Sequence, residues 1–153
     1  MKHDAVMLMG RIHDLTQKWL RGELAAAGLS GIVPSHGDVL ALLFMKGEAT
    51  MHELAAFAHR TKPTTTVLVD KLEEVGLVRR MQSEDDARSV VVVLTAEGEA
   101  LRGSFAAISK KLASRVYSPL SKDEGEMLEK LLNKVLSNLE AAKNAETESA
   151  KSD

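Results

Sequence analysis

Cysteine is absent from this chain of 153 residues. Disulfide bridges, thiolate metal sites, cysteine nucleophiles and thiol redox switches are therefore excluded. Aromatic residues make up only 3 % of the sequence, so the core has to be built from aliphatic side chains, alanine and methionine. That composition suits packed helices better than an aromatic-rich β-sandwich.

An excess of charge of one sign is also missing. Lys and Arg number 20 and Asp and Glu number 22, which leaves a formal net charge of -2. This balance excludes a histone-like polycationic binder. A sequence-specific DNA-binding protein remains compatible with it, because such a protein needs a local basic face rather than a basic total.

Long apolar runs are missing as well. No apolar stretch approaches the roughly 20 residues that a membrane-spanning helix needs. The N-terminus lacks the pattern of a signal peptide, because Asp4 and Arg11 enclose too short an apolar stretch. On the absence of these targeting signals, we expect a cytoplasmic protein.

The middle of the chain carries the most informative pattern. Thr50 and Glu53 form a capping box that opens a short helix, and Thr61 is a good N-cap for a second helix. Two segments, 77–81 and 90–94, then predict a hairpin, because a polar acidic turn separates them. A helix, a turn, a second helix and a hairpin are the order of a winged helix-turn-helix.

The second helix of this module has an unusual outward face. Its inner stripe (Thr65, Leu68, Val69, Leu72) has helical spacing, whereas its outer face is short, small and rich in hydroxyls. Hydroxyls can bond to bases and phosphates, and small apolar groups can meet thymine methyls. We therefore predict a DNA-contacting set on this helix and the hairpin: Thr61, Lys62, Pro63, Thr64, Thr66, Val67, Lys71, Arg80, Arg88 and Ser89.

Arg88 lies near the tip of the predicted hairpin. An arginine on a protruding β-ribbon is well placed to enter a DNA minor groove, whose negative potential attracts it. The alternative is an ion pair with Asp85 or Asp86 in the same turn. Both interpretations can hold, because exposed ion pairs are weak.

Helical periodicity flanks the module on both sides, with apolar residues three and four apart. Before it, we expect Ser35 to cap a central buried helix, with Asp38 completing a capping box. After it, Thr95 opens a helix that continues until Ser118-Pro119 breaks it, and a last helix follows.

With these motifs, the chain resembles the multiple-antibiotic-resistance regulator (MarR) family of bacterial winged-helix transcription factors. The flanking helices also fall where that family has its dimerisation helices, so the resemblance covers nearly the whole chain. The matching motifs are E-L-A at 53–55, T-x-L-V-D-R/K-L at 66–72, E-x-x-G-L-V at 73–78, D-x-R at 86–88 and L-T-x-x-G at 94–98.

The resemblance implies specific roles. The second helix would be the recognition helix, Arg88 the wing-tip arginine, and the flanking helices a homodimer interface. The chain departs from the family at three places. Many members have a basic residue in place of Val67, an arginine in place of Ala87 and a glycine in place of His59. The first two departures remove positive charge from the DNA-facing side.

We therefore predict a mainly α fold with a small β-hairpin wing, as a winged helix-turn-helix with N- and C-terminal dimerisation helices. A single unit would span residues 1–145. Its winged core would cover about 35–95 and its dimerisation helices about 4–27 and 96–142. Residues 146–153 would form a disordered tail.

The function implied is that of a dimeric, sequence-specific transcriptional regulator, with double-stranded DNA as partner. We expect it to repress a pseudo-palindromic operator and to be released by a small aromatic or amphipathic effector. Trp19, His36, Leu40 and Phe44 would line the effector cleft, since aromatic walls with one polar group suit such ligands. Packing in the core is the alternative for each of them.

Three other functions have weaker support in the sequence. Catalysis is not expected, because His52-Glu53 lacks the second histidine of H-E-x-x-H and no phosphate loop or nucleophile elbow occurs. No cofactor is expected. A metal-responsive regulator is one alternative, and without cysteine its metal site would have to combine carboxylates with histidines. A winged helix that binds protein instead of DNA is the other, and the charge-poor recognition face would fit it. The histidines are His3, His13, His36, His52 and His59.

Overall fold

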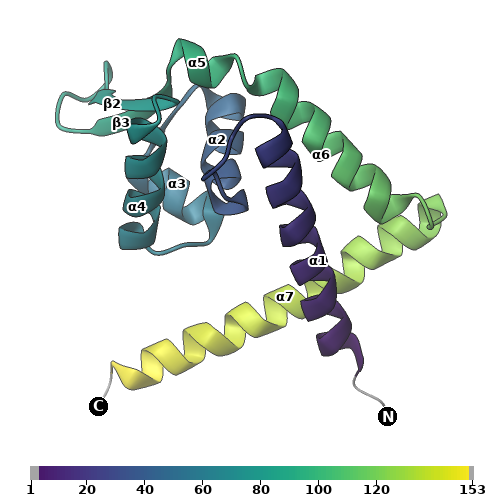
Figure 1. Ribbon diagram of the computed structural model, residues 1–153. Coiled ribbons are helices and arrows are strands. Elements are labelled where there is room, and N and C mark those ends of the chain that lie inside the picture. Colours follow the sequence, from purple (N-terminus) through teal and green to yellow (C-terminus); the bar gives the residue numbers. More distant parts are fainter. Residues whose placement is uncertain (1–3, 152–153) are drawn as a thin grey trace. The chain divides into compact units, whose positions relative to one another are not determined.

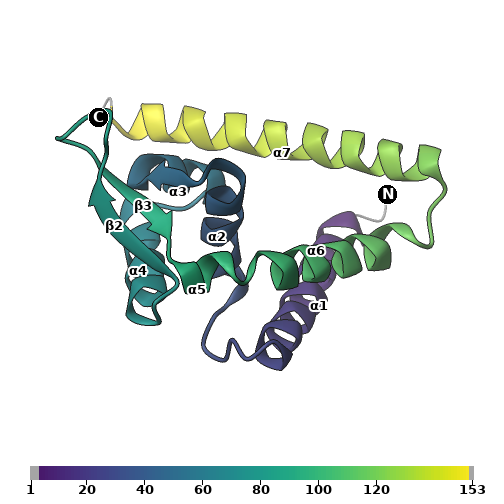
Figure 2. The same cartoon turned by 90° about the horizontal axis from the view of Figure 1, so that it is seen from above.

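The structure, a computed structural model, describes residues 4–151. The chain divides into two compact units, Met1–Lys110 and Lys111–Asp153. Helices dominate and a small antiparallel sheet accompanies them, which confirms the predicted fold class. Figures 1 and 2 show the elements in two views. In chain order they are α1 (Asp4–Ala26), α2 (Pro34–Lys46), β1 (Glu48–Thr50), α3 (Met51–Ala58), α4 (Lys62–Glu74), β2 (Val78–Gln82), β3 (Val90–Leu94), α5 (Ala96–Glu99), α6 (Arg102–Tyr117) and α7 (Lys122–Ala150).

The core of the first unit is built around α2. This helix is apolar nearly all round, and it packs against α3, α4 and β3. Val39, Leu40 and Leu43 have no exposed surface. The C-terminal half of α1 joins this core through Leu24, which is buried, and through Trp19, which is partly buried. Trp19 thus packs against the core, as its place on an apolar helix stripe favours.

The sheet has the strand order β1-β3-β2, with β3 in the middle. The predicted hairpin is confirmed: β2 and β3 pair antiparallel from Val78 opposite Leu94 to Gln82 opposite Val90. Figures 1 and 2 show this hairpin projecting away from the helices of the first unit. The third strand, β1, was not predicted. It has only three residues and owes its strand conformation to pairing with β3, which local sequence patterns do not reveal.

Helices α3 and α4 begin as their sequences predict. The Thr50 hydroxyl accepts a hydrogen bond from the Glu53 amide at 3.2 Å, and the Glu53 carboxylate accepts one from the Thr50 amide at 2.9 Å. The Lys46 ammonium lies 2.6 Å from the same carboxylate, and its hydrogen bond is the main reason why the Glu53 pKa is lowered. Thr61 caps α4 by accepting from the Thr64 amide at 3.3 Å.

The prediction for the start of α2 was wrong. Val33, not Ser35, is the N-cap residue, and Pro34 is the first residue of the helix. The Val33 amide donates to Nδ1 of His36 at 2.9 Å. The imidazole thus accepts the hydrogen bond of the N-cap amide, as the glutamate side chain does in a capping box. Ser35 instead lies inside the first turn, where its hydroxyl accepts from Arg60 at 3.3 Å.

The turn between α3 and α4 requires a left-handed residue at its first position. His59 has φ 51° and ψ 43°, and among residues 4–151 it is the one non-glycine residue with a positive φ. Its amide and that of Arg60 bond back to the end of α3, which ends the helix with a left-handed C-cap. A side chain makes this conformation unfavourable, so the glycine common in related proteins at this position has a physical reason.

We therefore expect His59→Gly to stabilise the fold by about 1 kcal/mol, because relief of the left-handed strain outweighs the added entropy of the unfolded chain. Urea or thermal unfolding followed by circular dichroism measures the change. His13→Gly is the matched control. His13 is an exposed residue inside α1, where glycine should cost about 0.5–1 kcal/mol. Destabilisation of similar size at both positions would show that the conformation of His59 carries no strain.

Helix formation after β3 differs from the prediction of one continuous helix from Thr95. Thr95 does cap α5, accepting from the Gly98 amide at 3.1 Å. However, α5 ends at Glu99, and α6 begins only at Arg102. The Leu101 amide bonds to the Gly98 carbonyl at 3.1 Å, a tight turn that redirects the chain. Leu101, the residue before α6, then packs against the core.

The second unit contains the end of α6 and all of α7. Ser121 and Glu124 form the predicted capping box of α7, with hydrogen bonds of 3.3 Å and 2.8 Å. α7 continues to Ala150, so residues 146–150 are helical where a disordered tail was predicted. Glu146, Glu148 and Ala150 of this segment are strong helix formers, and they continue the long helix that precedes them. Residues 152–153 of the predicted tail lie outside the described residues.

Within residues 4–151, no helix has both the length and the apolar character needed to cross a membrane.

Candidate nucleic-acid interface

The outward face of α4 is exposed over its N-terminal half. Its inner stripe is buried, as predicted, with Thr65, Val69 and Leu72 without exposed surface. The predicted contact residues from Thr61 to Val67 all lie outside this stripe and are exposed. Val67 is 67 % exposed, a large fraction for an apolar side chain in mid-helix. Helix α4 therefore presents small side chains that the chain's own core does not cover.

The threonine hydroxyls on this face are already bonded within the helix. The Thr61 and Thr64 hydroxyls lie 2.9 Å apart and share one hydrogen bond. The Thr66 hydroxyl donates to the Lys62 carbonyl at 3.0 Å. These bonds restrict the rotamers of these threonine side chains, which are all exposed.

Positive charge on α4 is limited to two lysines. Lys62, in the first turn, makes no ion pair with any described residue and is exposed. Lys71, half-buried near the end of the helix, lies 3.7 Å from Glu74. Lys62 therefore adds a free charge to a helix N-terminus, whose amides and dipole favour a phosphate group.

Arg80 occupies a different environment from that predicted. Its guanidinium lies 2.6 Å from the Asp70 carboxylate and 3.0 Å from that of Glu73, and its backbone amide also donates to Glu73. Two carboxylates thus neutralise this arginine and tie β2 to the end of α4. A role in positioning the hairpin against α4 accounts for these contacts, and the sequence pattern did not suggest it.

The tip of the hairpin is organised by Asp86. This carboxylate accepts from the Arg88 amide at 3.0 Å and from the Ser89 hydroxyl at 3.3 Å. The Arg88 guanidinium makes no ion pair with Asp85, Asp86 or any other carboxylate among residues 4–151, so the alternative interpretation of Arg88 is not supported. Arg88 is exposed, with its charge available at the tip. The turn was predicted, but the bonds from the Asp86 carboxylate to Arg88 and Ser89 were not, although aspartate typically makes such bonds in turns.

The residues predicted for an effector cleft are packed to different degrees. Leu40 has no exposed surface, and His36 is 6 % exposed. Burial lowers the pKa of His36, and the positive charge of Lys71 lowers it further. The imidazole is therefore neutral at pH 7, with Nδ1 accepting from Val33 and the proton on Nε2. These contacts favour the core-packing interpretation for Leu40 and His36.

Phe44 packs against α6. Its ring centroid lies 5.7 Å from that of Phe105, and the Arg102 guanidinium lies 5.0 Å above the ring. Arg102 also donates to the Phe44 carbonyl at 2.7 Å and pairs with Glu99. This cluster holds the end of α2 to the start of α6. The contact between Arg102 and Phe44 was not predicted, because the two residues lie far apart in the chain.

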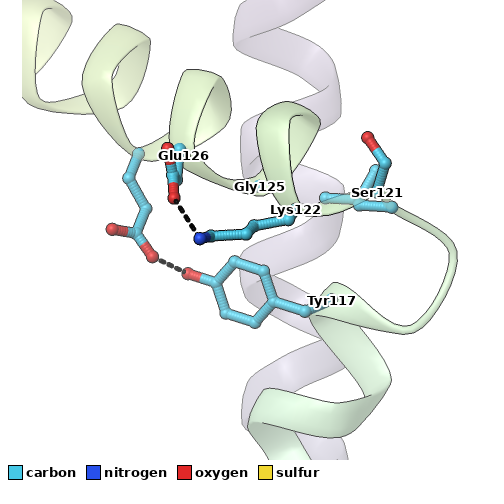
Figure 3. Close-up of a pocket in the computed structure, with 7 residues that line it drawn as sticks. Tyr117, Ser121, Lys122, Gly125 and Glu126 are labelled. Carbon is cyan, nitrogen blue, oxygen red and sulfur yellow. Dashed lines mark hydrogen bonds and ion pairs between the residues drawn. The ribbon is translucent and has the colours of Figure 1, made fainter.

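The second unit contains a pocket of about 320 Å³ at the turn between α6 and α7 (Figure 3). Its polar side chains pair with one another: the Tyr117 hydroxyl donates to Glu129, and Lys122 lies 3.8 Å from Glu126. None of the four residues predicted for an effector cleft lines this pocket.

A metal centre finds no support in the described part of the chain. Among residues 4–151, no group of three or more histidine, aspartate or glutamate side chains could hold a metal ion. His36 uses Nδ1 for the Val33 amide, and His59 ends a helix. His3, the N-terminal candidate, lies outside the described residues.

Comparisons with known sequences agree with this geometry. A protein-family model described as MarR family matches residues 32–90, from the start of α2 to the start of β3. The HTH-type transcriptional regulator MgrA of Staphylococcus aureus is 33 % identical over 98 residues, which are 64 % of this chain and 65 % of MgrA. The match therefore spans slightly less than two thirds of that relative. The uncharacterized HTH-type transcriptional regulator YkoM of Bacillus subtilis is 32 % identical over 104 residues, 68 % of either protein.

Solved structures extend the likeness over most of the chain. A crystal structure of S. aureus MepR in complex with DNA has a TM-score of 0.77 and 26 % identity, and the match covers 91 % of this chain and 98 % of MepR. A mutant of MarR from E. coli in complex with operator DNA has a TM-score of 0.72 and 25 % identity, with 87 % and 96 % covered. From the match of its winged core to the family model and the identity to YkoM over two thirds of that regulator, we conclude that the chain belongs to the MarR family.

Proposed function

We propose that this protein is a DNA-binding transcriptional regulator that uses α4 and the wing to contact double-stranded DNA. The observation that carries the proposal is the outward face of α4, which is exposed, small and hydroxyl-rich, with an unpaired Lys62 at its N-terminus and an unpaired Arg88 on the adjoining wing. The DNA complexes of MepR and of E. coli MarR support it by likeness. The family is one of regulators rather than enzymes, in agreement with the prediction that the chain is not an enzyme.

The regulator is proposed to act as a homodimer. Both predicted dimerisation segments carry apolar side chains that are exposed in the single chain, which favours burial against a second copy. In the N-terminal half of α1 these are Val6, Met7, Leu8, Ile12 and Leu15, and in α7 they are Met127, Leu131, Leu132, Val135, Leu136 and Leu139. Two recognition helices related by a two-fold axis would fit a pseudo-palindromic operator with half-sites about one helical turn apart.

Repression, release by a small aromatic or amphipathic effector, and a cytoplasmic location complete the proposal. They extend from the family to which the chain belongs. Of the four residues predicted for the effector cleft, Trp19 and Phe44 keep partly exposed aromatic surface, and they are the better candidates for contact with a ligand.

Fluorescence anisotropy of a labelled DNA fragment from upstream of the protein's own gene tests DNA binding. We expect Arg88→Ala to weaken binding at least about tenfold and to make the salt dependence shallower by about one unit of slope for each protomer. The loss follows because Arg88 is exposed and unpaired, so that its charge can enter a groove.

Lys143→Ala is the matched control, because it removes one positive charge from α7, outside the winged core. It should leave the affinity and the salt slope unchanged. If Arg88→Ala behaves like this control, the wing does not contact DNA. If the wild-type protein is a folded dimer but binds no duplex at low salt, the proposed function is wrong.

A further inference from the structure

Helix α4 lacks arginine, asparagine and glutamine, which together with lysine make the bidentate contacts to guanine and adenine. Of its two lysines, Lys71 lies 3.7 Å from Glu74. The acidic Asp70 is held by Arg80 at 2.6 Å. Lys62 lies in the first turn, where a phosphate contact is favoured. Base discrimination by α4 therefore has to come from a different kind of contact.

Methyl groups make up the exposed middle of the helix. The Thr66 hydroxyl is turned back onto the Lys62 carbonyl at 3.0 Å, and Cγ2 is the only other heavy-atom branch at its Cβ. The exposed part of the Thr66 side chain is therefore its methyl group. Val67, the next residue, is 67 % exposed and adds two more methyl groups. Together they form a small apolar surface, which we call the methyl patch of α4.

We infer that α4 recognises its DNA site through thymine C5-methyl groups, which pack against the methyl patch in the major groove. This inference rests on the proposed function, because it requires α4 to enter that groove. Among the four standard bases, thymine alone presents a methyl group there. The patch thus selects A·T pairs opposite the middle of α4 and makes Thr66 and Val67 determinants of specificity.

Replacing thymidine by deoxyuridine in the duplex tests the inference directly. Uracil keeps the same hydrogen-bonding groups and lacks only the methyl. With one methyl contact worth about fourfold in each of two half-sites, the wild-type protein should bind the uracil duplex about 16-fold more weakly. Val67→Ala should reduce this ratio at least about twofold, since part of the apolar contact is lost. Val75→Ala, at the exposed valine that ends α4, should keep the wild-type ratio.

The outcomes separate the inference from the proposed function. Equal affinity of the wild-type protein for the two duplexes would overturn methyl recognition but leave DNA binding intact. A ratio that is the same in Val67→Ala as in the wild type would also overturn it, because the methyl would then act through DNA shape. Failure to bind the thymidine duplex at low salt would instead overturn the proposed function.

Discussion

Gly98→Ala is expected to lower the free energy of unfolding by about 3 kcal/mol or more, which corresponds to a fall in Tm of about 6–12 °C. A Cβ at this position would lie against the Leu77 carbonyl oxygen, well inside the 3.0 Å that real Cβ contacts respect, and 3.1 Å from Leu94 Cδ2. Backbone cannot move aside as a flexible side chain can. The turn between α4 and β2 or the start of α5 would have to shift.

Gly103→Ala provides the matched control for this prediction. Gly103 lies in α6 with no atom within 4 Å of an added Cβ, so alanine should stabilise the helix by up to about 1 kcal/mol. Urea unfolding of both variants, followed by circular dichroism, measures the contrast in sign. A Gly98→Ala variant within about 0.5 kcal/mol of the wild type would contradict the close approach to Leu77.

The close approach of Gly98 to the Leu77 carbonyl explains why two of the sequence motifs were informative. Gly76 ends α4 with φ +80°, and the Thr95 hydroxyl donates to its carbonyl at 2.5 Å. The Thr95 amide donates to the Leu77 carbonyl at 3.1 Å, the group that Gly98 also approaches. E-x-x-G-L-V and L-T-x-x-G are therefore two halves of one junction. Because residue type is dictated there by backbone geometry, the motifs allowed this part of the fold to be predicted.

Features that depend on distant partners were not predictable in this way. The strand β1 exists through its pairing with β3, far along the chain. The Val33 cap of α2 is a local feature that was missed for another reason, because a histidine takes the place of the usual glutamate of a capping box. In the candidate site, too, local features could be predicted and contacts between separated residues could not. The exposure of α4 followed from its periodicity, whereas the neutralisation of Arg80 depended on two carboxylates seven and ten residues away. A single sequence carries no signal for which charges will meet in space.

Val67→Glu should abolish most DNA binding without harming the fold. Val67 is 67 % exposed, and glutamate is a better helix former than valine, so the stability should stay within about 0.5 kcal/mol of the wild type. In the groove, however, the carboxylate would replace an apolar contact and face the phosphates. A loss of about tenfold for each recognition helix multiplies to about 100-fold for a dimer. Anisotropy titration and urea unfolding of the same preparation measure the two effects separately.

Val67→Lys is the complementary variant, because it changes the charge at the same position in the other direction. It should raise affinity and make the slope of log affinity against log salt steeper by about 0.9 for each protomer, as one more phosphate is neutralised. Discrimination between thymine and uracil should fall at the same time, since the methyl patch is lost. If glutamate and lysine at this position give equal affinities, α4 does not face the DNA. The opposite responses of affinity and base discrimination in Val67→Lys would separate the electrostatic part of binding from the part that reads sequence.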